Sequence, residues 1–146
     1  MRTILNITGY AAIVIGLAGL FNPEYLGDHF GAAHNLLHLG FGALTVYFAG
    51  WASTDNVSSF AITLGIAYLL AGSVGLAFGS PGSPLELGPS DPRLLRLIPG
   101  WIELGTADHV YHAVAGVFCI TAGWRAGPRP RHGIKTAAEK REPVLR

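Results

Sequence analysis

Residues 33–50 read AHNLLHLGFGALTVYFAG, an apolar run of membrane-helix length whose ionisable side chains lie in its first turn and a half. Residues 107–124, ADHVYHAVAGVFCITAGW, follow the same layout. When the two runs are aligned on their central histidines, His38 and His112, the neighbouring positions also correspond: Gly42 with Gly116, Asn35 with His109, and His34 with Asp108. This correspondence predicts that the chain contains a repeated structural unit.

The composition is that of a membrane protein. Half of the 146 residues are hydrophobic and only 13% are charged, whereas soluble domains have roughly a quarter charged residues. The net charge of +1 gives no indication of a nucleic-acid partner. The single cysteine, Cys119, lies within an apolar run and is expected to be a packing residue.

Four apolar runs are long enough to cross a bilayer, at about residues 4–21, 33–51, 59–78 and 108–124. Glycines recur within them at helical spacing, as in helices that pack closely in membranes. The sequence therefore predicts an all-α integral membrane four-helix bundle in residues 1–124, built from two repeated helical hairpins. The short link at 52–58 further predicts that the second and third runs form an antiparallel hairpin.

The longest connection, the outer loop at residues 79–106, has a proline-rich first half that excludes regular helix. Its second half, 93–104, reads RLLRLIPGWIEL and has two interpretations. It is either a short helix in the headgroup region anchored by Trp101, or a loop packed over the end of the bundle. Thr106 and Asp108 are the candidate N-caps of the helix that follows.

The last segment, 125–146, is basic and poor in apolar residues, so a disordered tail is expected. Positive charge favours the cytoplasmic side, and four crossings place both termini on the same side. We therefore expect both termini in the cytoplasm. The expected partners are the lipid bilayer and possible further membrane subunits. A signal peptide is the less favoured interpretation of run 4–21, because no small-residue cleavage motif follows it.

Ionisable residues gather at the starts of the second and fourth runs. His34 and His38 are one turn apart on one helix face, and Asp108 and His112 are one turn apart on the other. Buried polar groups in membrane helices usually pair with one another. The favoured interpretation is a polar lock, in which these side chains and Asn35 join the second and fourth helices of a non-enzymatic structural or accessory protein.

Two alternatives use the same residues as ligands. A transition metal could be held by His34, His38, Asp108 and His112, with His109 nearby, since imidazole and carboxylate bind such ions. A haem could instead take His38 and His112 as axial ligands. A proton relay is less favoured, because the first and third runs contain no acidic residue. The sequence has no recognisable catalytic motif, so an enzyme is not expected.

The paired motifs HNLLHLGFGAL and TADHVYHAVAGV resemble those of the bacterial membrane-protein family called domain of unknown function 4383. Members of that family are small four-helix proteins with an Asp/Asn-x-x-His-x-x-x-Gly type of motif at the start of two helices. In this chain His34 and His109 stand where Asp and Asn are common. The resemblance implies a bacterial inner-membrane location and a four-helix fold, and it implies no activity.

Overall fold

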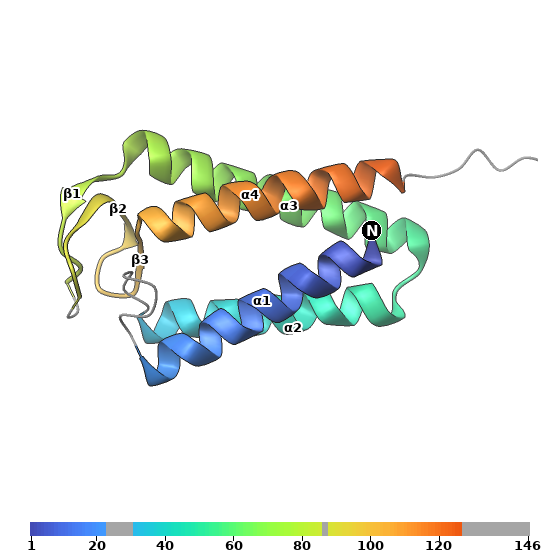
Figure 1. The fold of residues 1–146 in the computed structure, drawn as a ribbon, viewed down its shortest axis with the longest axis horizontal. Helices are drawn as coiled ribbons and strands as arrows, with labels where there is room; N and C mark the ends of the chain where they lie inside the picture. The colour runs from blue at the N-terminus through green and yellow to red at the C-terminus, as the bar shows by residue number, and fades with distance from the viewer. Residues whose placement is uncertain (23–30, 86–87, 127–146) are drawn as a thin grey trace, which may run out of the picture.

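A computed structural model describes residues 1–22, 31–85 and 88–126. It contains four helices: α1 (Arg2–Phe21), α2 (Ala32–Trp51), α3 (Thr54–Phe78) and α4 (Thr106–Arg125). The helices pack as two hairpins, α1 with α2 and α3 with α4, which lie side by side in Figure 1. The prediction of four helices in two hairpins is confirmed. The predicted tail lies, apart from Arg125 and Ala126, outside the described residues.

Helix α3 begins five residues earlier than predicted. The hydroxyl of Ser53 accepts a hydrogen bond from the backbone N–H of Asn56 at 3.4 Å, so Ser53 is the N-cap of the helix. Asp55 stands in the first turn, where its negative charge complements the helix dipole. The polar residues that looked like a turn therefore form the first turn of α3.

The close helix pairs are set by glycines, and this corrects the predicted pairing of the second and third runs. A Cβ atom on Gly42 would lie 2.8 Å from the carbonyl oxygen of Gly9, and one on Gly116 would lie 2.7 Å from that of Gly65. Gly42 and Gly116 thus face their own hairpin partners. Although the link between α2 and α3 is short, these two helices pack against each other only slightly. The predicted 33–51/59–78 hairpin was wrong, because backbone approach at glycine decides the pairing.

The two hairpins meet at their opposite ends in different ways. Near the α2–α3 link, six buried residues form an apolar core: Leu5, Ala49, Val57, Ala61, Leu64 and Cys119. The rings of Phe48 and Phe60 stack there with centroids 4.2 Å apart. At the other end, where α2 and α4 begin, the side chains between the hairpins are polar.

A small antiparallel sheet follows α3, with strands β1 (Ser80–Gly82), β2 (Asp91–Ile98) and β3 (Ile102–Leu104) in the order β1-β2-β3. Of the two interpretations of 93–104, the interfacial helix was wrong, because the segment forms strands. Gly100 adopts a φ of 75°, and the N–H of Trp101 bonds the carbonyl of Ile98, so the chain turns back in the middle of the segment. The sheet contacts the ends of α2, α3 and α4, and thus packs over the end of the bundle (Figure 1).

The sheet also caps α4. The carboxylate of Asp91 accepts hydrogen bonds from the backbone N–H of Thr106 at 2.9 Å and from its hydroxyl at 2.8 Å. The N-cap residue itself is Gly105, which has no side chain to serve this role. Neither predicted cap, Thr106 or Asp108, fills the position. Because Asp91 satisfies the helix start, Asp108 is not needed as a cap, and its carboxylate lies inside the bundle near His34.

The distribution of side chains is the reverse of that in a soluble bundle. The buried helical positions are mostly small or polar, whereas large apolar side chains are exposed on all four helices. Among the described residues, α1 and α3 are long and apolar enough to cross a membrane, with mean hydropathies of 2.0 and 1.9. The helices α2 and α4 carry polar first turns, which lower their mean hydropathy.

Replacing Gly65 with alanine should weaken the α3–α4 pair. The added Cβ would lie 2.7 Å from Ile120 Cγ1 and 2.8 Å from the carbonyl oxygen of Gly116. We expect a loss of about 1–3 kcal/mol, measured as a lower midpoint of denaturation in detergent. Gly40→Ala is the matched control, because no atom lies within 4 Å of its Cβ position, and it should be neutral or slightly stabilising. Equal effects of the two variants would contradict this packing.

The Asp91 cap should give a pH-dependent stability. Burial raises the pKa of the Asp91 carboxyl, but hydrogen bonds from Thr106 and from the Arg93 backbone outweigh burial and leave the pKa below its ordinary value. The stabilisation is therefore complete above about pH 4 and is lost as the pH falls through the lowered pKa. Asp91→Ala should cost about 1 kcal/mol at pH 7, and this difference from the native chain should shrink in acid. A difference that stays constant down to pH 2 would contradict the assignment.

Candidate functional site

Three ionisable side chains converge where α2 meets α4. The Nε2 atoms of His34 and His38 are 3.0 Å apart, a hydrogen-bonding distance. The Oδ1 atom of Asp108 lies 3.6 Å from His34 Nε2 and 3.9 Å from His38 Nε2. The three ligand atoms thus lie within a sphere small enough for a single ion. The predicted meeting of these residues across the two helices is observed.

The cluster is closed to solvent. The exposed fractions are 3% for His34, 5% for His38 and 3% for Asp108. A buried carboxylate is costly unless a positive charge or several donors balance it. Two imidazoles at this distance can supply the charge, either by holding a proton or by sharing a bound cation.

His112 stands beside the cluster with a defined tautomer. Its Nδ1 lies 2.7 Å from the backbone carbonyl oxygen of Asp108. A carbonyl only accepts, so Nδ1 carries the proton and the neutral ring presents a lone pair on Nε2. The ring centroid of His112 is 5.8 Å from that of His38. His112 therefore adjoins the cluster as predicted, and its main hydrogen bond is to its own helix.

Two tyrosines that the sequence reasoning did not single out complete the surroundings. The ring of Tyr68 on α3 meets His112 edge to face at 5.0 Å, and Tyr111 lies 5.4 Å from the same ring. In the sequence, each tyrosine lies within a predicted membrane run, and a polar hydroxyl in such a run could have indicated a residue near the cluster. Tyr111 also adjoins His112 in sequence and is about one turn from Asp108.

A cavity of about 240 Å³ adjoins the cluster. His34, His38 and His112 line one side of it. Leu97 of β2, with Ile102 and Leu104 of β3, lines the side toward the sheet. The sheet therefore closes the end of the bundle over the histidines, the position expected for segment 93–104 despite its different secondary structure.

The cavity does not suit haem. Small-molecule pockets have volumes of about 300–1,000 Å³, and a macrocycle needs a wide slot between its two axial ligands. Here the cavity is smaller than that range, and the rings of His38 and His112 are only 5.8 Å apart with Tyr111 close to both. The residues present fit a single ion better than a haem.

His109 faces away from the cluster, although its sequence position suggested a ligand. Its Nε2 donates to the carbonyl oxygen of Arg93 at 2.8 Å, which ties α4 to β2. The ring fills the space beside Gly75 on α3, where any Cβ would overlap it. Asn35, predicted as part of the lock, is fully buried on α2, and its backbone carbonyl packs against Gly16 of α1.

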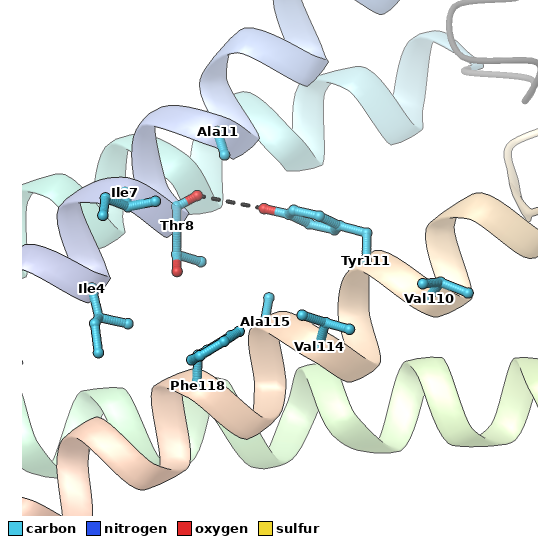
Figure 2. Close-up of a pocket in the computed structure, with 9 residues that line it drawn as sticks. All are labelled: Ile4, Ile7, Thr8, Ala11, Val110, Tyr111, Val114, Ala115 and Phe118. Carbon is cyan, nitrogen blue, oxygen red and sulfur yellow. Dashed lines mark hydrogen bonds between the residues drawn. The ribbon is translucent and has the colours of Figure 1, made fainter.

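A second, larger groove of about 490 Å³ lies between α1 and α4 (Figure 2). Its lining is apolar except for Thr8 and Tyr111, and the Tyr111 hydroxyl donates to the Thr8 carbonyl at 3.4 Å across the groove. Its lining residues contain no cluster of histidines or carboxylates.

Comparisons with protein-family models, curated proteins and solved structures gave no match to this chain. The resemblance to domain of unknown function 4383 therefore stays a prediction.

Proposed function

We propose that this chain is a multi-pass protein of a bacterial inner (plasma) membrane, with four crossings and a non-enzymatic structural or accessory role. One observation carries the proposal: large apolar side chains are outside and small or polar ones inside. Representative exposed fractions, one from each helix in order, are 65% for Ile7, 63% for Leu36, 59% for Leu70 and 55% for Phe118. Such a surface is unfavourable in water and favourable in lipid.

The exposure of apolar side chains also supports membrane crossings by α2 and α4, in addition to α1 and α3. The polar residues of α2 and α4 that lower their hydropathy are buried, so their outer faces remain apolar. On α4 the outward positions are mostly valine and phenylalanine: Val110, Val114, Val117 and Phe118. A polar interior with an apolar exterior is typical of functional membrane bundles.

The charges support one orientation. Arg2 and Arg125 lie at the end of the bundle that carries the α2–α3 link, and the basic tail follows Arg125. The guanidinium of Arg2 donates to the carbonyls of Ala49 and Ala52, which fixes this charge at the end of α2. We therefore place this end in the cytoplasm and the sheet on the outer side.

Labelling single cysteines tests the membrane topology. In a Cys119→Ala background, Ser83→Cys should react with a membrane-impermeant maleimide in intact cells, whereas Thr54→Cys should react only after permeabilisation. Both positions are exposed in the protein, so reactivity reports the side of the membrane. Release of the chain from membranes by alkaline carbonate would contradict the integral placement, and the reversed labelling pattern would contradict the orientation.

A duplicated hairpin is supported by the packing. Gly9, Gly16 and Gly19 of α1 have the same spacing as Gly65, Gly72 and Gly75 of α3. A Cβ on Gly16 would meet the carbonyl of Asn35, and one on Gly72 would meet that of His109, which are the aligned positions of α2 and α4. Equivalent glycines thus contact equivalent residues, as an internal repeat requires.

The proposed role of the His34–His38–Asp108 cluster is to lock the hairpins. The backbones of α2 and α4 have little contact, so the side chains span the distance between them. A protonated imidazole beside Asp108 balances its charge in an interior with little water, which fixes the relative position of the hairpins. Further membrane subunits would then dock on the apolar outer faces of a fixed bundle.

A double-mutant cycle on chelator-treated protein tests the lock. His34→Leu and Asp108→Leu should each lower the thermal midpoint in detergent, because each leaves a buried polar partner behind. The double variant should recover much of the loss, giving a coupling of about 1–3 kcal/mol. The control cycle combines His109→Leu with Asp108→Leu. Because His109 bonds to Arg93 and not to Asp108, the losses of stability from these two changes should be nearly additive. Additivity in the His34–Asp108 cycle would rule out the lock.

A further inference from the structure

We propose that His34, His38 and Asp108 form a binding site for one divalent transition-metal ion of the zinc class, shared between the two hairpins. The inference uses the same cluster as the proposed lock, and it does not depend on the lock being the cluster's role in the metal-free protein.

The distances carry the proposal. The two Nε2 atoms and Asp108 Oδ1 form a triangle with sides of 3.0, 3.6 and 3.9 Å. The point equidistant from its corners is about 2.1 Å from each atom, which matches zinc–imidazole and zinc–carboxylate bond lengths of about 2.0–2.2 Å. The separations of the three atoms therefore suit one shared ion.

The positions of the ligands on the helices favour a site over a chance contact. His34 and His38 are four residues apart on α2, the spacing by which a single helix presents two imidazoles to one zinc ion. The third ligand comes from α4 of the other hairpin. All three are nearly fully buried, so the ion would replace a proton as the charge that balances Asp108.

The surroundings leave room for a fourth ligand. The two histidines and His112 line the cavity of about 240 Å³, whereas a water molecule occupies about 30 Å³ of liquid volume. His112 donates through Nδ1 to a backbone carbonyl, the kind of outer bond that keeps Nε2 available for a metal or its water. The fourth position of a tetrahedral ion would thus face the cavity.

The donor set selects the ion class. Two imidazoles with one carboxylate suit zinc, iron, cobalt and related ions, whereas calcium and magnesium prefer oxygen ligands throughout. The thiol of Cys119 is not part of the set, because it lies deep in the apolar core against the hydroxyl of Thr8. A zinc-class ion bound by imidazole and carboxylate is therefore the expected occupant.

Binding of the metal alone tests the proposal. The full chain is purified in mild detergent, stripped with a chelator and titrated with Zn²⁺, with bound metal counted by elemental analysis. One ion per chain is expected, together with a rise in thermal midpoint that Mg²⁺ does not produce. Co²⁺ should bind at the same stoichiometry and give visible absorption bands that report its coordination number.

Variants separate this site from other histidines. Asp108→Asn keeps the side-chain shape, and His38→Ala removes one imidazole; each should weaken Zn²⁺ binding by more than about 100-fold, since even outer-shell changes cost about 10–100-fold. His109→Gln is the matched control, because His109 is equally buried but bonded to Arg93, and it should bind one ion as the native chain does. Folding of each variant is checked by its helical circular dichroism.

The outcomes distinguish the two proposals. Absence of stoichiometric Zn²⁺ binding, or binding unchanged in folded Asp108→Asn, overturns the metal site and leaves the lock untouched. Loss of coupling between His34 and Asp108 in the metal-free cycle overturns the lock and leaves the metal site untouched. Equal loss of binding in His109→Gln and Asp108→Asn would also overturn the site, because Asp108 belongs to the proposed site and His109 does not.

Discussion

Keeping the carboxylate of Asp108 between two helical hairpins requires a partner for its charge, and several features of the structure meet that requirement. The imidazoles of His34 and His38 come within 4 Å of it from the facing helix. Asp91, on the sheet, takes over the capping of α4 that Asp108 would otherwise provide. Since a buried carboxylate without compensation is among the costliest groups in an interior, the arrangement of α2, α4 and β2 must be mutually consistent.

Helix contacts within each hairpin differ in kind from the contacts between the two hairpins. Within each hairpin, glycines allow backbones to touch, and the attraction is close packing. Between the hairpins, the contact is apolar near Leu5 and Val57 and polar near His38. In the membrane that we propose for this chain, lipid would provide no hydrophobic drive to pull apolar helices together, so a polar contact would give specificity that apolar packing alone lacks. The apolar end supplies buried area, and the lock that we propose at the polar end would fix the relative position of the hairpins.

The sequence predicted the helices and most of the cluster, for identifiable reasons. Long apolar runs have few alternatives, and a four-residue spacing places His34 and His38 on one helix face. The alignment of the second and fourth runs then brought Asp108 to the same level. Helix pairing was not predictable from the short link, because link length constrains which helices are neighbours and does not decide which of them approach closely.

The strands and the orientation of His109 could not be predicted from the sequence, because they depend on tertiary contacts. The strands at 91–104 form because Gly100 turns the chain and Asp91 and Arg93 bond to helix ends, so local periodicity could not reveal them. Likewise His109 and His112 are three residues apart, and the helical repeat alone would place both near the cluster. Their faces diverge because Gly75 leaves a space that the ring of His109 fills on its way to the Arg93 carbonyl.

The sheet links these observations to the accessibility of the cluster. Leu97, Ile102 and Leu104 line the cavity on the side of the sheet, and Arg93 holds β2 to both α3 and α4 through bonds to Leu76 and His109. The remaining wall of the cavity includes Leu37 and Phe41, side chains that are also exposed on the outer face of α2. Entry from the sheet end would require displacement of the sheet, whereas entry between α2 and α3 would pass exposed lining residues such as Leu37 and Ala67. The first route couples access to the hydrogen bonds of Arg93, and so to the packing of His109, a residue that takes no direct part in the cluster.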